Sequence, residues 1–131
     1  MAESLLLDTC ALIWLATGSE ELSKETRLLI AKAPKVFVSS VSAWELGVKC
    51  HKGKLTLPCD ARRWFTGVVE KYDLEVLGLS SDEMLTASEL PWYHKDPADR
   101  FIIATAQKNS LPVVTGDGNF PLYGISKMRG C

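Results

Sequence analysis

The sequence lacks the features that mark membrane, secreted and nucleic-acid-coating proteins. It has no apolar run near the ~20 residues that cross a bilayer. Its first residues, Met1 to Ser4, have neither the basic segment nor the long apolar core of a signal peptide. A formal net charge of −1 excludes a strongly basic coat protein, although a nuclease needs only a local basic surface. For 131 residues we expect a single domain spanning residues 1–131, located in the cytoplasm, with no membrane contact.

Residues that bind soft metals are also scarce. The chain has 4 cysteines and 2 histidines, and no two cysteines form a C-x-x-C pair. A zinc site can be assembled on paper, but its spacing matches no standard zinc pattern. Its ligands would be Cys50, His51, Cys59 and His94. Without a secretion signal, reduced thiols that are buried or incidental are the preferred interpretation.

Short apolar runs alternate with helical patterns along the whole chain. The runs predict strands at Leu5–Leu7, Val36–Ser39, Leu74–Leu77 and Val113–Thr115, and a short closing strand can follow near Ile125. Between them, helices are expected to begin at residues whose side-chain oxygen can cap a helix. These residues are Thr9, Ser23, Ser42, Asp60, Ser80 and Asp96. Strands that alternate with helices predict an α/β fold of three layers, with a mostly parallel sheet between helices.

One of these helices is expected to be buried. Asp96 followed by Pro97 is typical of a helix start, because aspartate caps the free N–H groups and proline suits the first position. Asp99 then falls in the first turn, and the segment Phe101–Ala106 carries almost no polar side chain. A carboxylate at the mouth of a buried helix either favours the helix dipole or belongs to a site.

Four carboxylates fall where a parallel sheet places its ligands, beyond the carboxyl ends of the strands. They are Asp8, Glu45, Asp99 and Asp117. Taken singly, capping, the helix dipole and turn formation explain all but Asp8, because an ionisable residue ending a buried strand is unusual. Taken together they repel, since two unit charges ~4 Å apart cost about 4 kcal/mol at a surface-like dielectric. Such a cluster requires protons or a cation.

The chemistry of these side chains indicates which cation. Oxygen ligands alone suit a hard ion, Mg²⁺ with Mn²⁺ as a substitute, which keeps waters for a substrate phosphate. An ion held by carboxylates that activates water is the machinery of phosphodiester hydrolysis. We therefore predict that the four acids are both the metal ligands and the catalytic residues.

Four stretches carry a family resemblance, in the family's order: Leu5–Thr9, Val38–Leu46, His94–Ala106 and Val113–Asp117. They resemble PIN-domain nucleases, most closely the VapC-type ribonuclease toxins of toxin–antitoxin pairs. The resemblance covers nearly the whole chain and is most specific from Asp96 to Arg100. It implies a parallel sheet of about five strands and RNA cleavage at the acidic Mg²⁺ site. It further implies a homodimer, a small antitoxin, and support of the acids by hydrogen bonds from Thr9 and Thr115.

Some neighbouring side chains have two interpretations. Arg100 either contacts substrate phosphate or serves packing or a surface ion pair. Lys49 fits an ordinary helical ion pair with Glu45. The basic stretch to which Lys49 belongs is either a surface for the RNA backbone or a solvated face. Its members are Lys49, Lys52, Lys54, Arg62 and Arg63.

The preferred prediction is a Mg²⁺-dependent endoribonuclease that acts as a toxin. One rival is a non-toxic or inactive PIN-like module that binds RNA or protein and uses its acids as helix caps. The other is a phosphatase with Asp8 as an aspartyl nucleophile, which is weakened because Cys10 stands where a second acid would follow. Capping acids have no reason to bind Mg²⁺ together, so metal binding separates the first rival from the nuclease.

Overall fold

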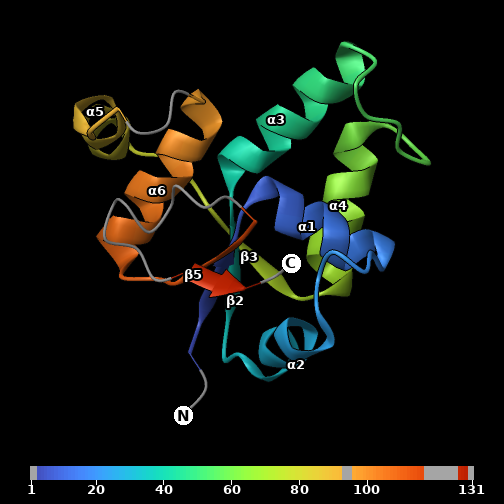
Figure 1. The fold of residues 1–131 in the computed structure, drawn as a ribbon. Coiled ribbons are helices and arrows are strands. Elements are labelled where there is room, and N and C mark those ends of the chain that lie inside the picture. The colour runs from blue at the N-terminus through green and yellow to red at the C-terminus, as the bar shows by residue number, and fades with distance from the viewer. Residues whose placement is uncertain (1–2, 93–95, 117–126, 130–131) are drawn as a thin grey trace.

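The protein is built on a parallel sheet. The structure is a computed structural model that describes residues 3–92, 96–116 and 127–129. Within these residues the strand order is β3-β2-β1-β4-β5, and each strand is parallel to its neighbours (Figure 1). The strands are β1 (Leu5–Leu7), β2 (Val36–Ser39), β3 (Leu74–Leu77), β4 (Val113–Thr115) and β5 (Lys127–Arg129). The closing strand predicted near Ile125 begins at Lys127, and Ile125 itself lies outside the described residues.

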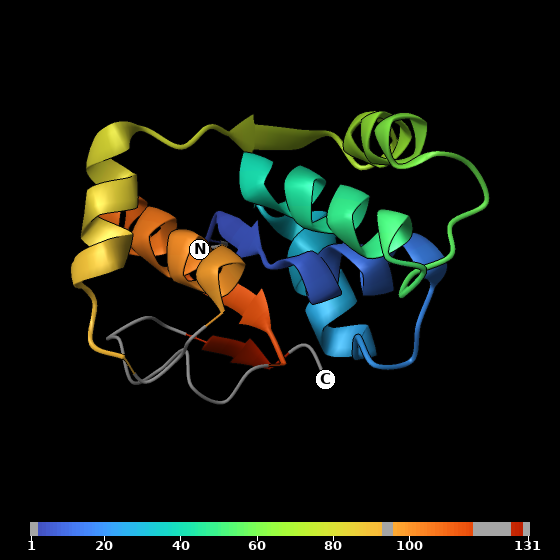
Figure 2. The same cartoon turned by 90° about the horizontal axis from the view of Figure 1, so that it is seen from above.

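Helices lie on both sides of this sheet, which confirms the predicted three-layer α/β architecture. They are α1 (Thr9–Thr17), α2 (Lys24–Lys32), α3 (Ser40–His51), α4 (Ala61–Lys71), α5 (Ser81–Glu89) and α6 (Pro97–Asn109). Figure 2 shows α5 and α6 on one side of the molecule and α1, α2 and α4 on the other. No helix in the described part of the chain is both long and apolar enough to span a bilayer.

The pleat of the strands divides the core into two clusters. Leu5 and Leu7 of β1 pack with α1, α2 and α4, whereas Leu6 packs with Ile102 and Ile103 of α6. Successive side chains of a strand point to opposite faces, so a strand buried on both faces is apolar throughout. This explains why all three leucines of β1 are at most 1% exposed. Of the α6 segment predicted to be buried, Ile102 to Ala106 are buried, whereas Phe101 is only partly buried.

Four predicted helix caps are confirmed, and two helix starts differ. Ser23, Asp60, Ser80 and Asp96 each accept a hydrogen bond from a first-turn N–H group. At α1 the cap is Asp8 rather than Thr9, and at α3 it is Ser39 rather than Ser42. The prediction for Ser42 was wrong because β2 passes into α3 without a loop, so Ser42 lies inside the helix.

A buried carboxylate ties α5 to α6. Glu83 is 6% exposed and accepts hydrogen bonds from Thr105 Oγ1 at 2.9 Å, Ser80 Oγ at 3.2 Å and Lys108 Nζ at 3.4 Å. Burial raises the pKa of this carboxyl, but the hydrogen bonds together outweigh burial and hold the pKa below its usual value of 4.5. A carboxyl whose pKa is lowered by folding stabilises the fold above its unfolded pKa, and this contribution is lost as the pH falls.

Thr105→Val is therefore expected to destabilise the protein by about 1–2 kcal/mol at neutral pH, because a buried carboxylate loses a donor. The cost should shrink in acid, where protonation removes the charge that Thr105 stabilises. Urea unfolding at neutral and acidic pH measures both values. Thr105→Ser keeps the hydroxyl and is the control. An equal cost at both pH values would assign the effect to packing instead.

Candidate active site

A pocket of about 450 Å³ opens at the carboxyl ends of the central strands. It lies between the junction of β1 with α1, the end of β4, the first turn of α6, and the part of α3 that carries Glu45 and Lys49. Its lining consists of Asp8, Thr9, Cys10, Trp14, Glu21, Glu45, Lys49, Asp96, Asp99 and Gly116. Three of the four predicted acids therefore share one pocket. Asp117, the fourth, lies outside the described residues, directly after Gly116 in the chain.

Asp8 is held in place by the helix it precedes. It is 5% exposed, and one carboxylate oxygen accepts the backbone N–H of Ala11 at 2.8 Å. The side chain caps α1 with one oxygen and also lines the pocket. Capping and membership of a site are thus compatible at this position, and the positive end of the α1 dipole stabilises the charge.

The two oxygens of the Glu45 carboxylate differ in their surroundings. Its Oε2 lies 3.4 Å from Lys49 Nζ, one helical turn later. Its Oε1 is buried and accepts no hydrogen bond from any residue that the structure describes. An unpaired buried carboxylate oxygen is costly, so it calls for a further partner such as a cation.

The start of α6 supplies two more carboxylates. Asp96 accepts the backbone N–H of Ala98 at 2.9 Å and that of Asp99 at 3.5 Å, as its predicted role as cap requires. Asp99, in the first turn, is partly buried and lines the pocket beside Asp96. The cap therefore fixes the turn from which the Asp99 side chain projects.

The thiol of Cys10 responds to the electrostatic field of the pocket. Its pKa is raised to about 11, chiefly by loss of hydration and next by the negative charge of Asp8. Glu45 and Asp99 raise the pKa further, whereas Lys49 lowers it. The charges that act on this thiol thus come from three separate parts of the sequence, in agreement with the shared lining of the pocket.

The donor set fits a hard, hydrated cation. In the described part of the chain no three Asp, Glu, His or Cys side chains are grouped closely enough to hold a metal ion. Mg²⁺ commonly takes only one or two carboxylates directly and keeps several waters, so a loose group of acids suits it. The unpaired Glu45 oxygen is the observation that favours such an ion.

Thr9 and Thr115, which were predicted to support the acids by hydrogen bonds, are both buried. Thr9 Oγ1 shares a buried hydrogen bond of 2.8 Å with Ser42 Oγ, which joins α1 to α3. Thr115 is fully buried at the end of β4. Ser42 was missed as a partner of Thr9, because it was expected to cap a helix rather than lie inside one.

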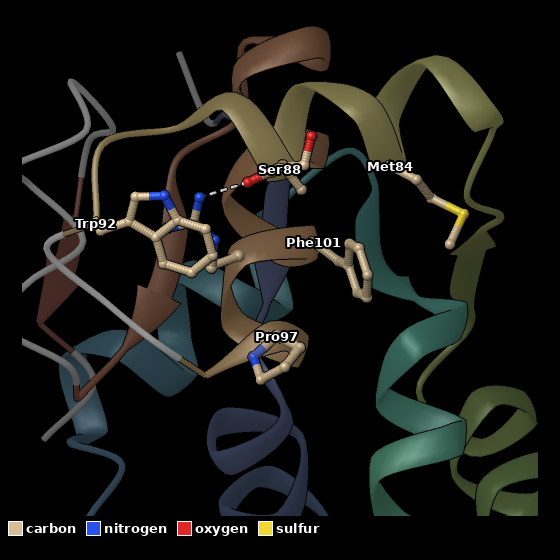
Figure 3. A pocket seen from close by; sticks show the side chains of 7 residues that line it. Met84, Ser88, Trp92, Pro97 and Phe101 are labelled. Atoms are coloured by element: carbon tan, nitrogen blue, oxygen red, sulfur yellow. Dashed lines mark hydrogen bonds between the residues drawn. The ribbon is translucent and has the colours of Figure 1, made fainter.

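Arg100 does not line the acidic pocket, which favours the packing role over the phosphate contact among its interpretations. It is 3% exposed and donates hydrogen bonds to the carbonyl oxygens of Ala87, Leu90 and Pro91. The Trp92 ring lies 3.5 Å from its guanidinium carbon. Figure 3 shows Trp92 beside Phe101 and Pro97 in a separate, mostly apolar pocket. The guanidinium of Arg100 therefore caps the carbonyl oxygens at the carboxyl end of α5.

The chain is similar to known proteins in sequence and in fold. Residues 5–125 match the family described as PIN domain. Over 115 residues, 87% of each protein, the chain is 28% identical to Ribonuclease VapC22 of Mycobacterium tuberculosis. A solved toxin-antitoxin complex from Klebsiella pneumoniae has a TM-score of 0.60 at 23% identity, covering 86% of both chains. Mycobacterium tuberculosis VapC20, a Sarcin-Ricin loop cleaving toxin, has a TM-score of 0.65 at 18% identity, covering 95% of this chain and 98% of that one.

Proposed function

This chain belongs to the PIN-domain family, and from that premise we propose that it is a Mg²⁺-dependent endoribonuclease, the toxin of a toxin–antitoxin pair. The observation that carries the proposal is the pocket shared by Asp8, Glu45 and Asp99, where one Glu45 oxygen has no hydrogen-bond partner among the described residues. Helix caps alone do not require three acids from distant parts of the chain to share a pocket. The similarity to a protein named as a ribonuclease favours RNA as the substrate.

Each acid has a defined part in this proposal. Asp8, Glu45, Asp99 and Asp117 would hold the ion, one or two of them directly and the others through its waters. The first turns of α1 and α6 add the positive ends of their helix dipoles at the same pocket. A bound Mg²⁺ supplies Lewis acidity and lowers the pKa of its water. The protein's own contribution is to fix the acids through the Asp8 and Asp96 caps, so that little reorganisation accompanies the reaction.

The proposed partners follow from the charge of the pocket and from the relatives. A small antitoxin that inserts an arginine into the pocket would pair with the carboxylates and compete with the metal. The similarity to a solved toxin-antitoxin complex supports such a partner. A homodimer is the assembly that the family resemblance favours.

Cleavage of total cellular RNA with Mg²⁺ and with chelator tests the function. We expect discrete fragments with Mg²⁺ or Mn²⁺ and none with chelator. Mn²⁺ should also raise the melting temperature, because the unfolded chain has no assembled site. Asp8→Asn should lose both effects. Intact RNA together with an unchanged melting temperature in millimolar Mn²⁺ would overturn the proposal, and RNA binding without cleavage would favour the inactive module.

A further inference from the structure

Lys49 has an unusual place among the basic residues of the chain. It lies one helical turn after Glu45 on α3, and its Nζ is 3.4 Å from Glu45 Oε2. The Lys49 side chain is 36% exposed, whereas that of Glu45 is only 13% exposed, so the pair reaches from solvent into the pocket. Among the described residues that line the pocket, Lys49 carries the only positive charge.

The excess of negative charge in the pocket indicates a role for the ammonium group of Lys49. The described lining of the pocket includes five carboxylates, those of Asp8, Glu21, Glu45, Asp96 and Asp99. One divalent cation and one lysine do not neutralise five negative charges. A negatively charged RNA phosphate approaching this lining is repelled unless a positive group meets it. Lysine suits that task, because its ammonium is a point charge on a flexible stem.

We propose that Lys49 is a substrate-binding residue that exchanges partners. In the metal-free pocket it balances Glu45. When a divalent cation occupies Glu45, the ammonium turns to an RNA phosphate at the cleavage site. This inference rests on the proposed ribonuclease function. An ordinary helical ion pair would instead stabilise α3 slightly and affect neither metal nor RNA.

Metal affinity tests the first half of the exchange without any RNA. Lys49→Met removes the cation that competes for Glu45, so Mn²⁺ should bind about tenfold more tightly by calorimetric titration. Lys49→Arg keeps the charge and should bind Mn²⁺ like the wild type. Lys35→Met is the matched control, because it breaks an exposed ion pair of 3.5 Å with Glu75 outside the acidic pocket.

Single-turnover cleavage tests the second half, with an RNA oligonucleotide that spans a mapped cleavage site. Lys49→Met should slow cleavage by about 10- to 100-fold, Lys49→Arg should restore most of the rate, and Lys35→Met should have no effect. If Lys49→Met loses one phosphate contact, the negative slope of log RNA affinity against log salt concentration should also become shallower by about 0.7.

The outcomes separate this inference from the function on which it rests. If the wild type cleaves RNA and Lys49→Met matches it in Mn²⁺ affinity and rate, the role of Lys49 is overturned and the nuclease stands. A slower variant with weaker Mn²⁺ binding would make Lys49 an organiser of the acids, which overturns the exchange of partners. If the wild type neither binds Mn²⁺ nor cleaves RNA, the proposed function fails, and the role of Lys49 fails with it.

Discussion

Replacing Asp99 by asparagine is expected to lower the rate of RNA cleavage by about two to three orders of magnitude, a loss of ~3–4 kcal/mol of transition-state stabilisation. The neutral amide occupies the same volume in the first turn of α6 but withdraws a negative charge from the proposed metal site. Folding should change little, because an acid near a helix N-terminus stabilises the helix by only about 0.3–1 kcal/mol. Cleavage of one RNA by wild type and variant, at matched folded fraction and with added Mg²⁺, measures the effect.

Asp96→Asn is the built-in control for Asp99→Asn. Both carboxylates line the same pocket within one helical turn, and Asp96 accepts the N–H groups of Ala98 and Asp99. Asparagine caps a helix about as well as aspartate, so Asp96→Asn should keep most of the cleavage activity. Equal activity of the two variants would show that the start of α6 is only a well-capped helix and would remove Asp99 from the site.

Much of the fold was predictable because its signals are local. A run such as Leu5–Leu7 is apolar on both faces, which is what a central parallel strand requires. Asp96 and Pro97 mark the start of α6 through the chemistry of the helix terminus. The start of α3 was not predictable in this way, because Ser39 and Ser42 are both good caps and only the direct passage from β2 into α3 selects Ser39.

The topology of the sheet predicts which acids lie near one another, but not every side chain that lines the pocket. The rule that ligands lie beyond the strand ends brought together Asp8, Glu45 and Asp99, which share no local signal. This rule does not predict that Lys49 lines the pocket, and the sequence gives no other signal, because a lysine four residues after a glutamate occurs on many exposed helices. Only the burial of Glu45 and the shape of the pocket distinguish this ion pair from a surface pair.

Arg100 shows why a residue next to a site acid in the sequence need not share its surroundings. It directly follows Asp99, so a contact with substrate phosphate was a natural interpretation. Because side chains on a helix diverge by about 100° per residue, adjacent residues face different surroundings. Asp99 lines the acidic pocket, whereas the guanidinium of Arg100 lies between the carboxyl end of α5 and the Trp92 ring.

Arg100→Leu is expected to destabilise the protein by about 3–4 kcal/mol, because buried carbonyl oxygens at the end of α5 lose their charged donor. The structure gives three such bonds, at 2.6 Å to Ala87, 2.8 Å to Leu90 and 3.1 Å to Pro91. Arg100→Lys should recover only part of this stability, since a single ammonium does not reproduce the planar fork that reaches all three acceptors. Urea unfolding of the wild type, Arg100→Leu and Arg100→Lys measures the three free energies of unfolding.

Activity per folded molecule decides between the structural role and the phosphate contact. If Arg100 only caps the end of α5, both variants should cleave RNA within a few-fold of the wild-type rate once the folded fraction is matched. Trp92→Ala, which removes the exposed ring above the guanidinium, should cost about 0.5–1 kcal/mol of stability and leave cleavage unchanged. A stable Arg100→Lys protein that has lost most of its activity would instead return Arg100 to the substrate, because a lysine retains the charge but not the bidentate grip on phosphate.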